Sequence, residues 1–297
     1  MSLPAPSLRA LLREVIDYAG LYPPAALSML DAVAVFATHL ASREAWMLGR
    51  FVVPVARLSE LAAEATRYAG GSEEPWRISV LLDAAEVGHA ATIRAFNDAH
   101  VGRLVIDAAE WRAPAPGEVA NAVRAMPDGI TSYVELPASS EPDQRLAEIG
   151  AATTRAKLRT GGITPDAFPT ASHVARFIGR CAARGVAFKA TAGLHHPLRA
   201  TYPLTYSDDA PRAKMFGFLN IFVASVFAHL GASERTVIDI VNEEDPGAFV
   251  FGDEALRWRQ DTALIEQITA SRRVLGNAFG SCSIDEPVSG LRELGVL

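Results

Sequence analysis

The chain has 297 residues, 49% of them hydrophobic, and a formal net charge of −6 at pH 7. This length suits one large domain, and the apolar content is enough to fill a sizeable core. Acidic and basic residues are interspersed without the basic stripe that marks nucleic-acid-binding proteins, so we do not expect nucleic acid as a partner.

Short strand-like runs alternate with helical patterns along most of the chain. The strand-like runs lie at 15–20, 50–55, 78–83, 104–107, 131–136, 156–160, 188–192 and 280–284. The helical patterns lie at 27–41, 58–68, 85–97, 117–125 and 171–184. Such alternation implies parallel strands joined by right-handed crossovers. Eight strands in this length predict an α/β fold, a (β/α)8 TIM barrel, and the missing Gly-x-Gly-x-x-Gly fingerprint disfavours an open dinucleotide-binding sheet.

The segment 198–277, between the last two strands, is far longer than a plain crossover. We predict a helical insertion here, within a single barrel domain that spans residues 1–297. Its apolar stretch, 215–230, is too short for a membrane span and predicts a buried helix. The insertion could cap the barrel mouth or join copies of the chain into a homo-oligomer.

Two further features bear on the compartment. Cys181 and Cys282 have neither metal-ligand nor disulfide spacing, which suits a reducing cytoplasm. Arg9 and Arg13 interrupt the apolar pattern near the N-terminus, so we expect no signal peptide. We therefore expect a cytoplasmic protein without a membrane partner.

Lysine is scarce, with three residues against 25 arginines. Lys214 has an ordinary helical context, but Lys157 and Lys189 each stand a few residues before a glycine, in Lys-Leu-Arg-Thr-Gly-Gly and Lys-Ala-Thr-Ala-Gly. Unlike arginine, lysine can lose its proton near neutral pH and act as an amine nucleophile. These two lysines are therefore the leading candidates for chemistry.

Strand alternation places Lys157 with Arg159 on one face, and Lys189 with Thr191 on one face. If the two segments are consecutive parallel strands, the lysines are neighbours across the pair. Mutual repulsion and burial would then lower the pKa of at least one amine, which allows attack on a carbonyl to form a Schiff base. The alternative is that both lysines only pair with acids or bind an anion.

Carboxylates stand near several strand ends, where barrel enzymes place their active sites. Asp17, Asp107 and Glu135 are candidates for proton transfer, whereas Asp83 precedes a helical pattern and could cap it. Glu135 lies in an apolar strand and would need a partner such as Lys157.

Groups that could hold an anion follow the same strands. Arg159 and the backbone N–H groups of Gly161 and Gly162 suit a carboxylate or phosphate. His195 follows the second lysine motif and could act as an acid or base.

The lysine motifs match a known pattern. Residues 157–161 form Lys-x-x-Thr-Gly, residues 189–193 form Lys-x-x-x-Gly, Ile-Asp occurs at 16–17, and Phe-Gly-Ser-Cys-Ser occurs at 279–283. In this order the four segments resemble deoxyribose-phosphate aldolase, a class I aldolase with a (β/α)8 barrel. The resemblance implies that Lys157 forms the Schiff base, that Lys189 lowers its pKa and that Asp17 lies nearby. Arg159 and the long insertion depart from the family, so we expect a different substrate.

The sequence therefore predicts a Schiff-base-forming carbon–carbon lyase that acts on a small anionic carbonyl or sugar-like substrate and requires no metal or organic cofactor. The expected catalytic residues are Lys157, Lys189, Asp17, Asp107 and Glu135. The expected substrate-binding residues are Arg159, Thr160, Gly161, Gly162, Thr191, Gly193, His195, Gly280, Ser281 and Ser283. Two alternatives stay open: a metal-dependent lyase or isomerase using Glu135 and His195, and a non-catalytic anion-binding barrel.

Overall fold

Eight parallel strands close into a barrel in the computed structural model, which describes residues 3–69, 74–82, 88–112, 117–136 and 142–297. Around the barrel the strand order is β1-β13-β7-β6-β5-β4-β3-β2. Their bounds are β1 Ile16–Tyr18, β2 Leu48–Pro54, β3 Trp76–Leu82, β4 Leu104–Arg112, β5 Thr131–Leu136, β6 Arg155–Arg159, β7 Phe188–Thr191 and β13 Gly276–Ser281. The predicted (β/α)8 fold is confirmed. Asp83 lies outside the described residues.

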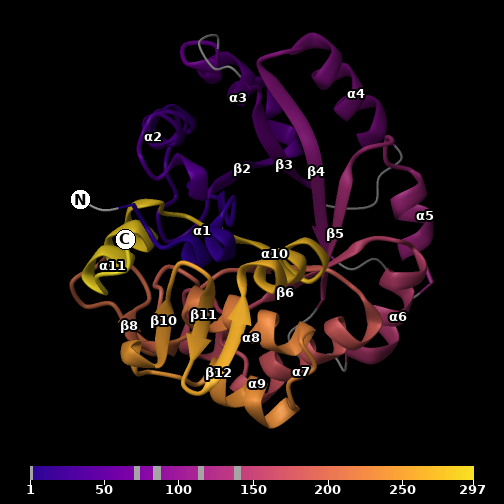
Figure 1. The fold of residues 1–297 in the computed structure, drawn as a ribbon. Coiled ribbons are helices and arrows are strands. Elements are labelled where there is room, and N and C mark those ends of the chain that lie inside the picture. The colour runs from indigo at the N-terminus through magenta and orange to yellow at the C-terminus, as the bar shows by residue number, and fades with distance from the viewer. Residues whose placement is uncertain (1–2, 70–73, 83–87, 113–116, 137–141) are drawn as a thin grey trace.

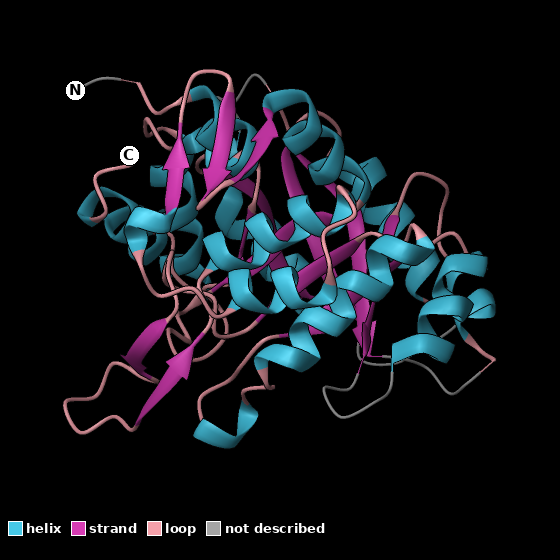
Figure 2. Cartoon of the chain, turned by 60° about the horizontal axis from the view of Figure 1, so that its bottom comes forward, coloured by secondary structure: helices cyan, strands magenta, loops and turns pink. Residues whose placement is uncertain are grey.

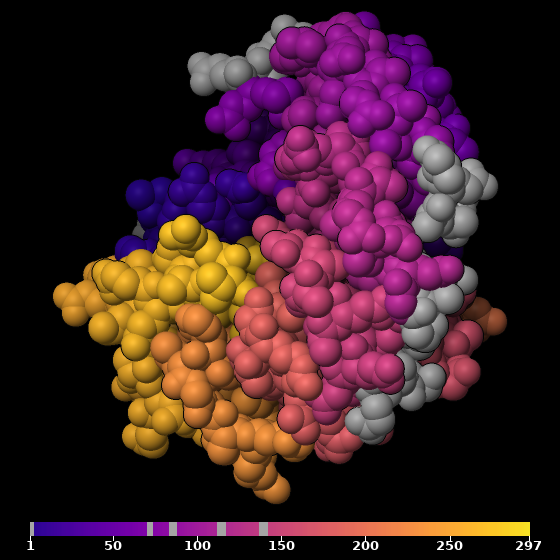
Figure 3. Space-filling view, turned by 90° about the vertical axis from the view of Figure 1, so that its right-hand side faces the viewer, coloured from indigo at the N-terminus to yellow at the C-terminus, as the bar shows by residue number. Residues whose placement is uncertain are grey.

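Helices surround the barrel, and between residues 29 and 184 they follow one another around it in chain order (Figure 1). They are α1 Pro6–Leu12, α2 Met29–Leu40, α3 Leu58–Ala65, α4 His89–Ala99, α5 Val119–Arg124, α6 Pro142–Ala151, α7 Ala171–Arg184, α8 Phe218–His229, α9 Glu234–Val241, α10 Ile265–Val274 and α11 Asp285–Glu293. On one side of the molecule, Figure 3 shows the chain passing from violet at the top to orange and yellow below, as expected for successive strand–helix units. Strands that alternate with helices in this way are the arrangement that the sequence pattern predicted.

Several helices begin and end where the sequence supplies capping residues. The side chains of Ser28, Thr170 and Ser233 each accept a hydrogen bond from the backbone N–H three residues later, at the starts of α2, α7 and α9. These bonds satisfy N–H groups that have no partner within the helix. Gly185 ends α7 with φ of 62°, a left-handed conformation that glycine adopts without steric cost. The capping residues in the sequence therefore determine where these helices begin or end.

The segment 198–277 contains α8, α9 and α10, but it also contains five short strands that the sequence pattern did not predict. They are β8 Ala200–Pro203, β9 Arg212–Met215, β10 Phe249–Phe251, β11 Ala255–Trp258 and β12 Asp261–Leu264. The strands form a two-stranded and a three-stranded antiparallel sheet. Figure 2 shows these two small sheets extending from different sides of the molecule.

The apolar stretch of this segment forms α8, whose residues 218–227 are all buried. The helix packs against α7, α10 and β13, so it belongs to the ring of helices around the barrel. Within the residues that the structure describes, no helix has the length and hydrophobicity to cross a bilayer.

Candidate active site

Lys157 and Lys189 occupy directly paired positions on β6 and β7, so the expectation that they are neighbours is confirmed. Their side chains are 7% and 1% exposed. Both line a cavity of about 600 Å³ that is formed by the carboxyl ends of the barrel strands and the loops after them. This is the end of the barrel at which TIM-barrel enzymes carry their active sites.

Glu110, on β4, lies between the two amines. Its Oε1 is 2.5 Å from the Nζ of Lys189, and its Oε2 is 3.0 Å from the Nζ of Lys157. The hydroxyl of Ser79 also donates to Oε1, at 2.5 Å. Burial opposes the ionisation of Glu110, but the charges of Lys189 and Lys157 outweigh it and hold its pKa well below the ordinary value. A buried carboxylate therefore holds the two cations together.

Asp17, on β1, completes the surroundings of Lys189. Its Oδ2 accepts a hydrogen bond from the Nζ of Lys189 at 2.5 Å, and its Oδ1 accepts one from the backbone N–H of Arg50 at 2.8 Å. The Asp17 side chain has no solvent exposure. The predicted proximity of Asp17 to the lysine pair is thus present in the structure.

Glu135, on β5, takes the corresponding place beside Lys157. Its Oε2 is 2.9 Å from the Nζ of Lys157, and its Oε1 accepts a hydrogen bond from the Nε of Arg159 at 3.1 Å. Burial opposes its ionisation, whereas Lys157 and Arg159 lower its pKa below the ordinary value. Three carboxylates and three cations therefore alternate in one row, which runs Asp17, Lys189, Glu110, Lys157, Glu135, Arg159.

The pKa of Lys189 moves in the direction opposite to the one expected for two lysines repelling each other. Burial disfavours its ammonium form, but Asp17 and Glu110 more than compensate and raise the pKa above its ordinary value. The expectation, made for at least one of the two amines, counted burial and the like charge of the neighbouring lysine, whereas Glu110 lies between the two. Lys189 is consequently a fixed ammonium at neutral pH.

Asp107, predicted as a proton-transfer group, does not lie with the lysines. Its carboxylate binds the Nε of Arg50 at 2.6 Å and the Nε of Arg77 at 2.9 Å, and it lines a second cavity at the amino-terminal end of the barrel. The predicted strand ended at Asp107, but β4 continues to Arg112 and brings Glu110 to the lysine pair instead. An acid in the apolar run Ala-Ala-Glu-Trp was the available signal, of the same kind as at Glu135.

Six of the predicted substrate-binding residues line the cavity at the lysine end, namely Arg159, Gly162, Thr191, Gly193, His195 and Gly280. Thr160, Ser281 and Ser283 were also predicted to bind substrate, but their hydroxyls form hydrogen bonds within the loops. Thr160 donates to the carbonyl of Ala192 at 2.6 Å, and Ser281 donates to the carbonyl of Ser283 at 2.6 Å. The Oγ of Ser283 accepts the backbone N–H of Glu286 at 3.1 Å. These three side chains therefore stabilise the loops of the mouth.

Gly161 and Gly193 are required by packing. A Cβ at Gly161 would overlap the ring of Phe168. Gly193 has φ of 72°, and a Cβ there would lie 2.9 Å from the same ring. Because glycine has no side chain, the loops after β6 and β7 can pack around Phe168. This packing accounts for both glycines and does not require a bound anion.

His195 adds a positive charge at the mouth. Its Nδ1 lies 3.3 Å from the Oε2 of Glu286 and 3.7 Å from the Sγ of Cys282. Burial disfavours the imidazolium, but contacts with Cys282 and Glu286 raise the pKa of His195 to about 9. The adjacent His196 stacks on Tyr202 with ring centroids 3.6 Å apart, and burial lowers its pKa to about 4. The two histidines therefore carry different charges at neutral pH.

The metal hypothesis relied on Glu135 and His195. Both oxygens of Glu135 are engaged, one by Lys157 and the other by Arg159. Within the described ranges, no group of three or more His, Cys, Asp or Glu side chains is arranged to hold a metal ion. The geometry thus offers this hypothesis no set of ligands in that part of the chain.

Together these features define a (β/α)8 barrel with a row of alternating charges at its carboxyl end. No protein-family model matches the chain, and no curated protein matches it significantly. Among solved structures, nitroalkane oxidase from Streptomyces ansochromogenes is similar, with 14% identity and a TM-score of 0.35 over 64% of this chain and 62% of that chain. The match spans less than two thirds of that protein, and a likeness this distant supports no inference about chemistry. The resemblance of the lysine motifs to deoxyribose-phosphate aldolase stays a prediction.

Proposed function

We propose that the chain is an enzyme, a class I aldolase-like carbon–carbon lyase that forms a Schiff base between Lys157 and a small anionic carbonyl substrate. One observation carries the proposal: the amine of Lys157 lines the cavity between two carboxylates, 3.0 Å from Glu110 and 2.9 Å from Glu135. A lysine with an adjacent proton acceptor and a carbonyl-sized cavity has what Schiff-base formation needs.

The geometry favours Lys157 over Lys189 as the nucleophile. Lys189 is only 1% exposed, and two carboxylates hold its Nζ at 2.5 Å each. Its raised pKa keeps it protonated. Lys157 has longer contacts, and its partner Glu135 is 14% exposed, so protons can pass between Glu135 and the cavity. In this arrangement Lys189 provides a permanent positive charge beside the nucleophile.

The first half of the reaction attaches the substrate. Glu135 accepts a proton from the Lys157 ammonium, and the free amine then adds to the carbonyl carbon to give a carbinolamine. Glu135 returns its proton to the carbinolamine hydroxyl, which leaves as water and produces a protonated Schiff base. Glu110 stays ionised throughout, because the ammonium of Lys189, 2.5 Å from its Oε1, keeps its charge while Lys157 reacts. Its charge stabilises the iminium that forms on Lys157.

The second half breaks a carbon–carbon bond. In a β-hydroxy carbonyl substrate, Glu135 takes the proton of the β-hydroxyl, and the bond between the α and β carbons breaks. The bonding electrons move into the iminium and give an enamine, while the departing fragment leaves as an aldehyde. The proton on Glu135 then returns to the α carbon, and water hydrolyses the Schiff base to free Lys157.

The rest of the cavity suits a substrate with a charged end and a short apolar part. Arg159 and the imidazolium of His195 supply positive charge at the mouth. Much of the remaining lining is apolar and comprises Pro23, Pro24, Val52, Pro54, Leu81, Leu82, Trp111 and Ile163. We expect a keto or aldehyde acid, or a phosphorylated counterpart, to bind with its anionic group near Arg159.

Borohydride trapping tests the proposal. The protein is incubated with a panel of aldehydes and β-hydroxy keto acids, reduced with borohydride and analysed by peptide mass spectrometry. We expect a reduced adduct on Lys157 that is abolished in Lys157→Arg and retained in Lys214→Arg, a matched change at an exposed lysine. An adduct confined to Lys214 or the N-terminal amine would contradict the assignment.

A second candidate is a non-catalytic barrel in which the lysines only balance buried acids. The observation in its favour is that each lysine contacts two carboxylates within 3.0 Å. It predicts that no carbonyl in the panel modifies Lys157. It also predicts that Lys157→Arg preserves ligand binding, because arginine carries the same charge.

A further inference from the structure

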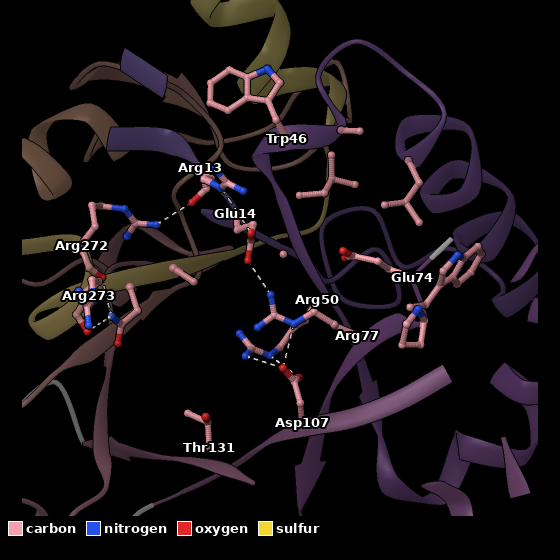
Figure 4. A pocket seen from close by; sticks show the side chains of 18 of the residues that line it. Arg13, Glu14, Trp46, Arg50, Glu74, Arg77, Asp107, Thr131, Arg272 and Arg273 are labelled. Atoms are coloured by element: carbon pink, nitrogen blue, oxygen red, sulfur yellow. Dashed lines mark hydrogen bonds and ion pairs between the residues drawn. The ribbon is translucent and has the colours of Figure 1, made fainter. Parts of the chain in front are cut away.

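A second cavity, of about 970 Å³, opens at the opposite, amino-terminal end of the barrel. Seven arginines line it, against three carboxylates, although the whole chain has a net charge of −6. The arginines are Arg9, Arg13, Arg50, Arg77, Arg155, Arg272 and Arg273, and the acids are Glu14, Glu74 and Asp107. Figure 4 shows Arg272 and Arg273 on one side and Arg50, Arg77 and Asp107 on another.

Two of these carboxylates are already shared among arginines. Asp107 binds both Arg50 and Arg77, through contacts of 2.6 and 2.9 Å. Glu14 binds Arg77 at 2.6 Å and lies 3.6 Å from Arg13. Neither acid therefore neutralises the remaining arginines of the cavity.

Arg272, on α10, is a guanidinium without a carboxylate partner among the described residues. Its Nη2 donates to the carbonyl of Arg13 at 3.1 Å, its Nη1 donates to the carbonyl of Gly276, and its Nε is buried with no hydrogen-bond partner. Burial lowers its pKa to about 10. Arg272 is half-buried, and its buried Nε has no partner among these residues, so this guanidinium would be stabilised by an anion in the cavity.

Arg155, on β6, contributes a second guanidinium of this kind. Its Nη1 donates to the hydroxyl of Tyr133 and to the Oδ1 of Asn277, at 3.1 Å each. Both acceptors are neutral, and no ion pair joins Arg155 to a carboxylate in the described part of the chain. Two arginines from different elements thus line one cavity without a carboxylate in direct contact among the described residues.

We propose that this cavity is a binding site for a small polyanion that carries two or more phosphate or carboxylate groups. Guanidinium groups bind such oxyanions through pairs of parallel hydrogen bonds, and the several arginines favour a ligand with more than one charged group. The volume lies within the range of small-molecule sites. Trp46 also lines the cavity and supplies an aromatic surface for the rest of a ligand. The site is separate from the lysine row and does not depend on the function proposed for it.

Calorimetry with inorganic pyrophosphate and with citrate tests the proposal, and tryptophan fluorescence reports on Trp46 and Trp76, which both line the cavity. We expect saturable binding of at least one probe to the wild-type protein. Arg272→Gln should weaken it at least tenfold. Arg235→Gln removes the same charge from an 83% exposed side chain on α9 and should leave the affinity unchanged. The better probe distinguishes a phosphate ligand from a carboxylate ligand.

Two results would overturn the site: no binding of either probe to folded wild-type protein at low salt, or equal weakening by Arg272→Gln and Arg235→Gln. If Arg272→Gln fails to fold, Arg9→Gln replaces it, because Arg9 is exposed and stacks on Trp46 at 4.8 Å from the ring centroid. Lys157→Arg should bind the probe normally. Loss of binding in that variant would place the polyanion at the lysine end instead.

Discussion

Lys157 lies directly opposite Lys189 in the register of β6 and β7, and the two amines contact the same carboxylate, that of Glu110. Two buried ammonium groups side by side would repel strongly if nothing lay between them. Glu110 converts the repulsion into two attractions. Its removal, or the removal of either lysine, therefore leaves a charge without its partner inside the barrel.

The lysine row is expected to be a major element of stability. Lys189→Met leaves Asp17 buried without its cation, and we expect the free energy of unfolding to fall by about 3–5 kcal/mol. Lys214→Met is the matched control, because Lys214 is 43% exposed and pairs with Glu244 at the surface. There we expect a loss below about 1 kcal/mol. Urea unfolding at neutral pH measures both, and equal losses would show that the buried pairing is not stabilising.

Glu110 should make the free energy of unfolding depend on pH in the acidic range. Its folded-state pKa is lowered, so its contribution is present above the unfolded pKa of about 4.3 and is lost as the pH falls further towards the folded value. Glu110→Gln removes this titration. The difference in unfolding free energy between wild type and Glu110→Gln should be largest near neutral pH and should shrink below about pH 4. Urea unfolding across this range measures it, and a difference independent of pH would contradict the predicted ionisation.

The adjacent histidines should titrate on opposite sides of neutral pH. NMR of the imidazole protons is expected to give pKa values of about 9 for His195 and about 4 for His196. Because the pKa of His195 is raised, its contribution to stability is full below about pH 6.5 and is lost as the pH rises through its folded value. Glu286→Gln should lower the pKa of His195, whereas Glu266→Gln, at an exposed position on α10, should not. An unchanged value in Glu286→Gln would remove Glu286 as the cause.

Substitution of two glycines by alanine tests whether Gly161 is required by packing. Gly161→Ala places a methyl group against the ring of Phe168, and we expect a loss of about 1–3 kcal/mol from overpacking. Gly179→Ala, within α7, meets no atom within 4 Å and should be neutral or stabilise the protein by up to about 1 kcal/mol through helix propensity. Thermal or chemical unfolding compares the two variants. If Gly161→Ala is as stable as Gly179→Ala, the loop after β6 does not depend on contact with Phe168.

The fold could be predicted because its signals are local. Each predicted strand overlaps a barrel strand, and the run at 131–136 matches β5 in both bounds. The five short strands of segment 198–277 were missed, because runs of three or four residues leave no period distinct from that of a loop.

The site could be predicted only in part. The glycine spacing after Lys157 and Lys189 identified the pair, but Glu110 was missed in favour of Asp107. These two acids are three residues apart, so strict alternation would send them to opposite faces. The register of β3 and β4 shifts, with Ile78 opposite Ile106 but Ser79 opposite Ala108. This bulge lets Asp107 bind Arg77 at one end of the barrel and Glu110 bind the lysines at the other.

Residue order alone was therefore enough to predict the barrel and, on the condition that the two lysine strands are consecutive, to make the lysines neighbours. These features follow from periodicity, and periodicity is carried by residues close together in the chain. The partners of the lysines required the folded molecule, because Asp17, Glu110 and Glu135 come from β1, β4 and β5 and meet only when the barrel closes. The same closure, with the register shift between β3 and β4, separates the acid that joins the lysines from the acid that joins the arginines.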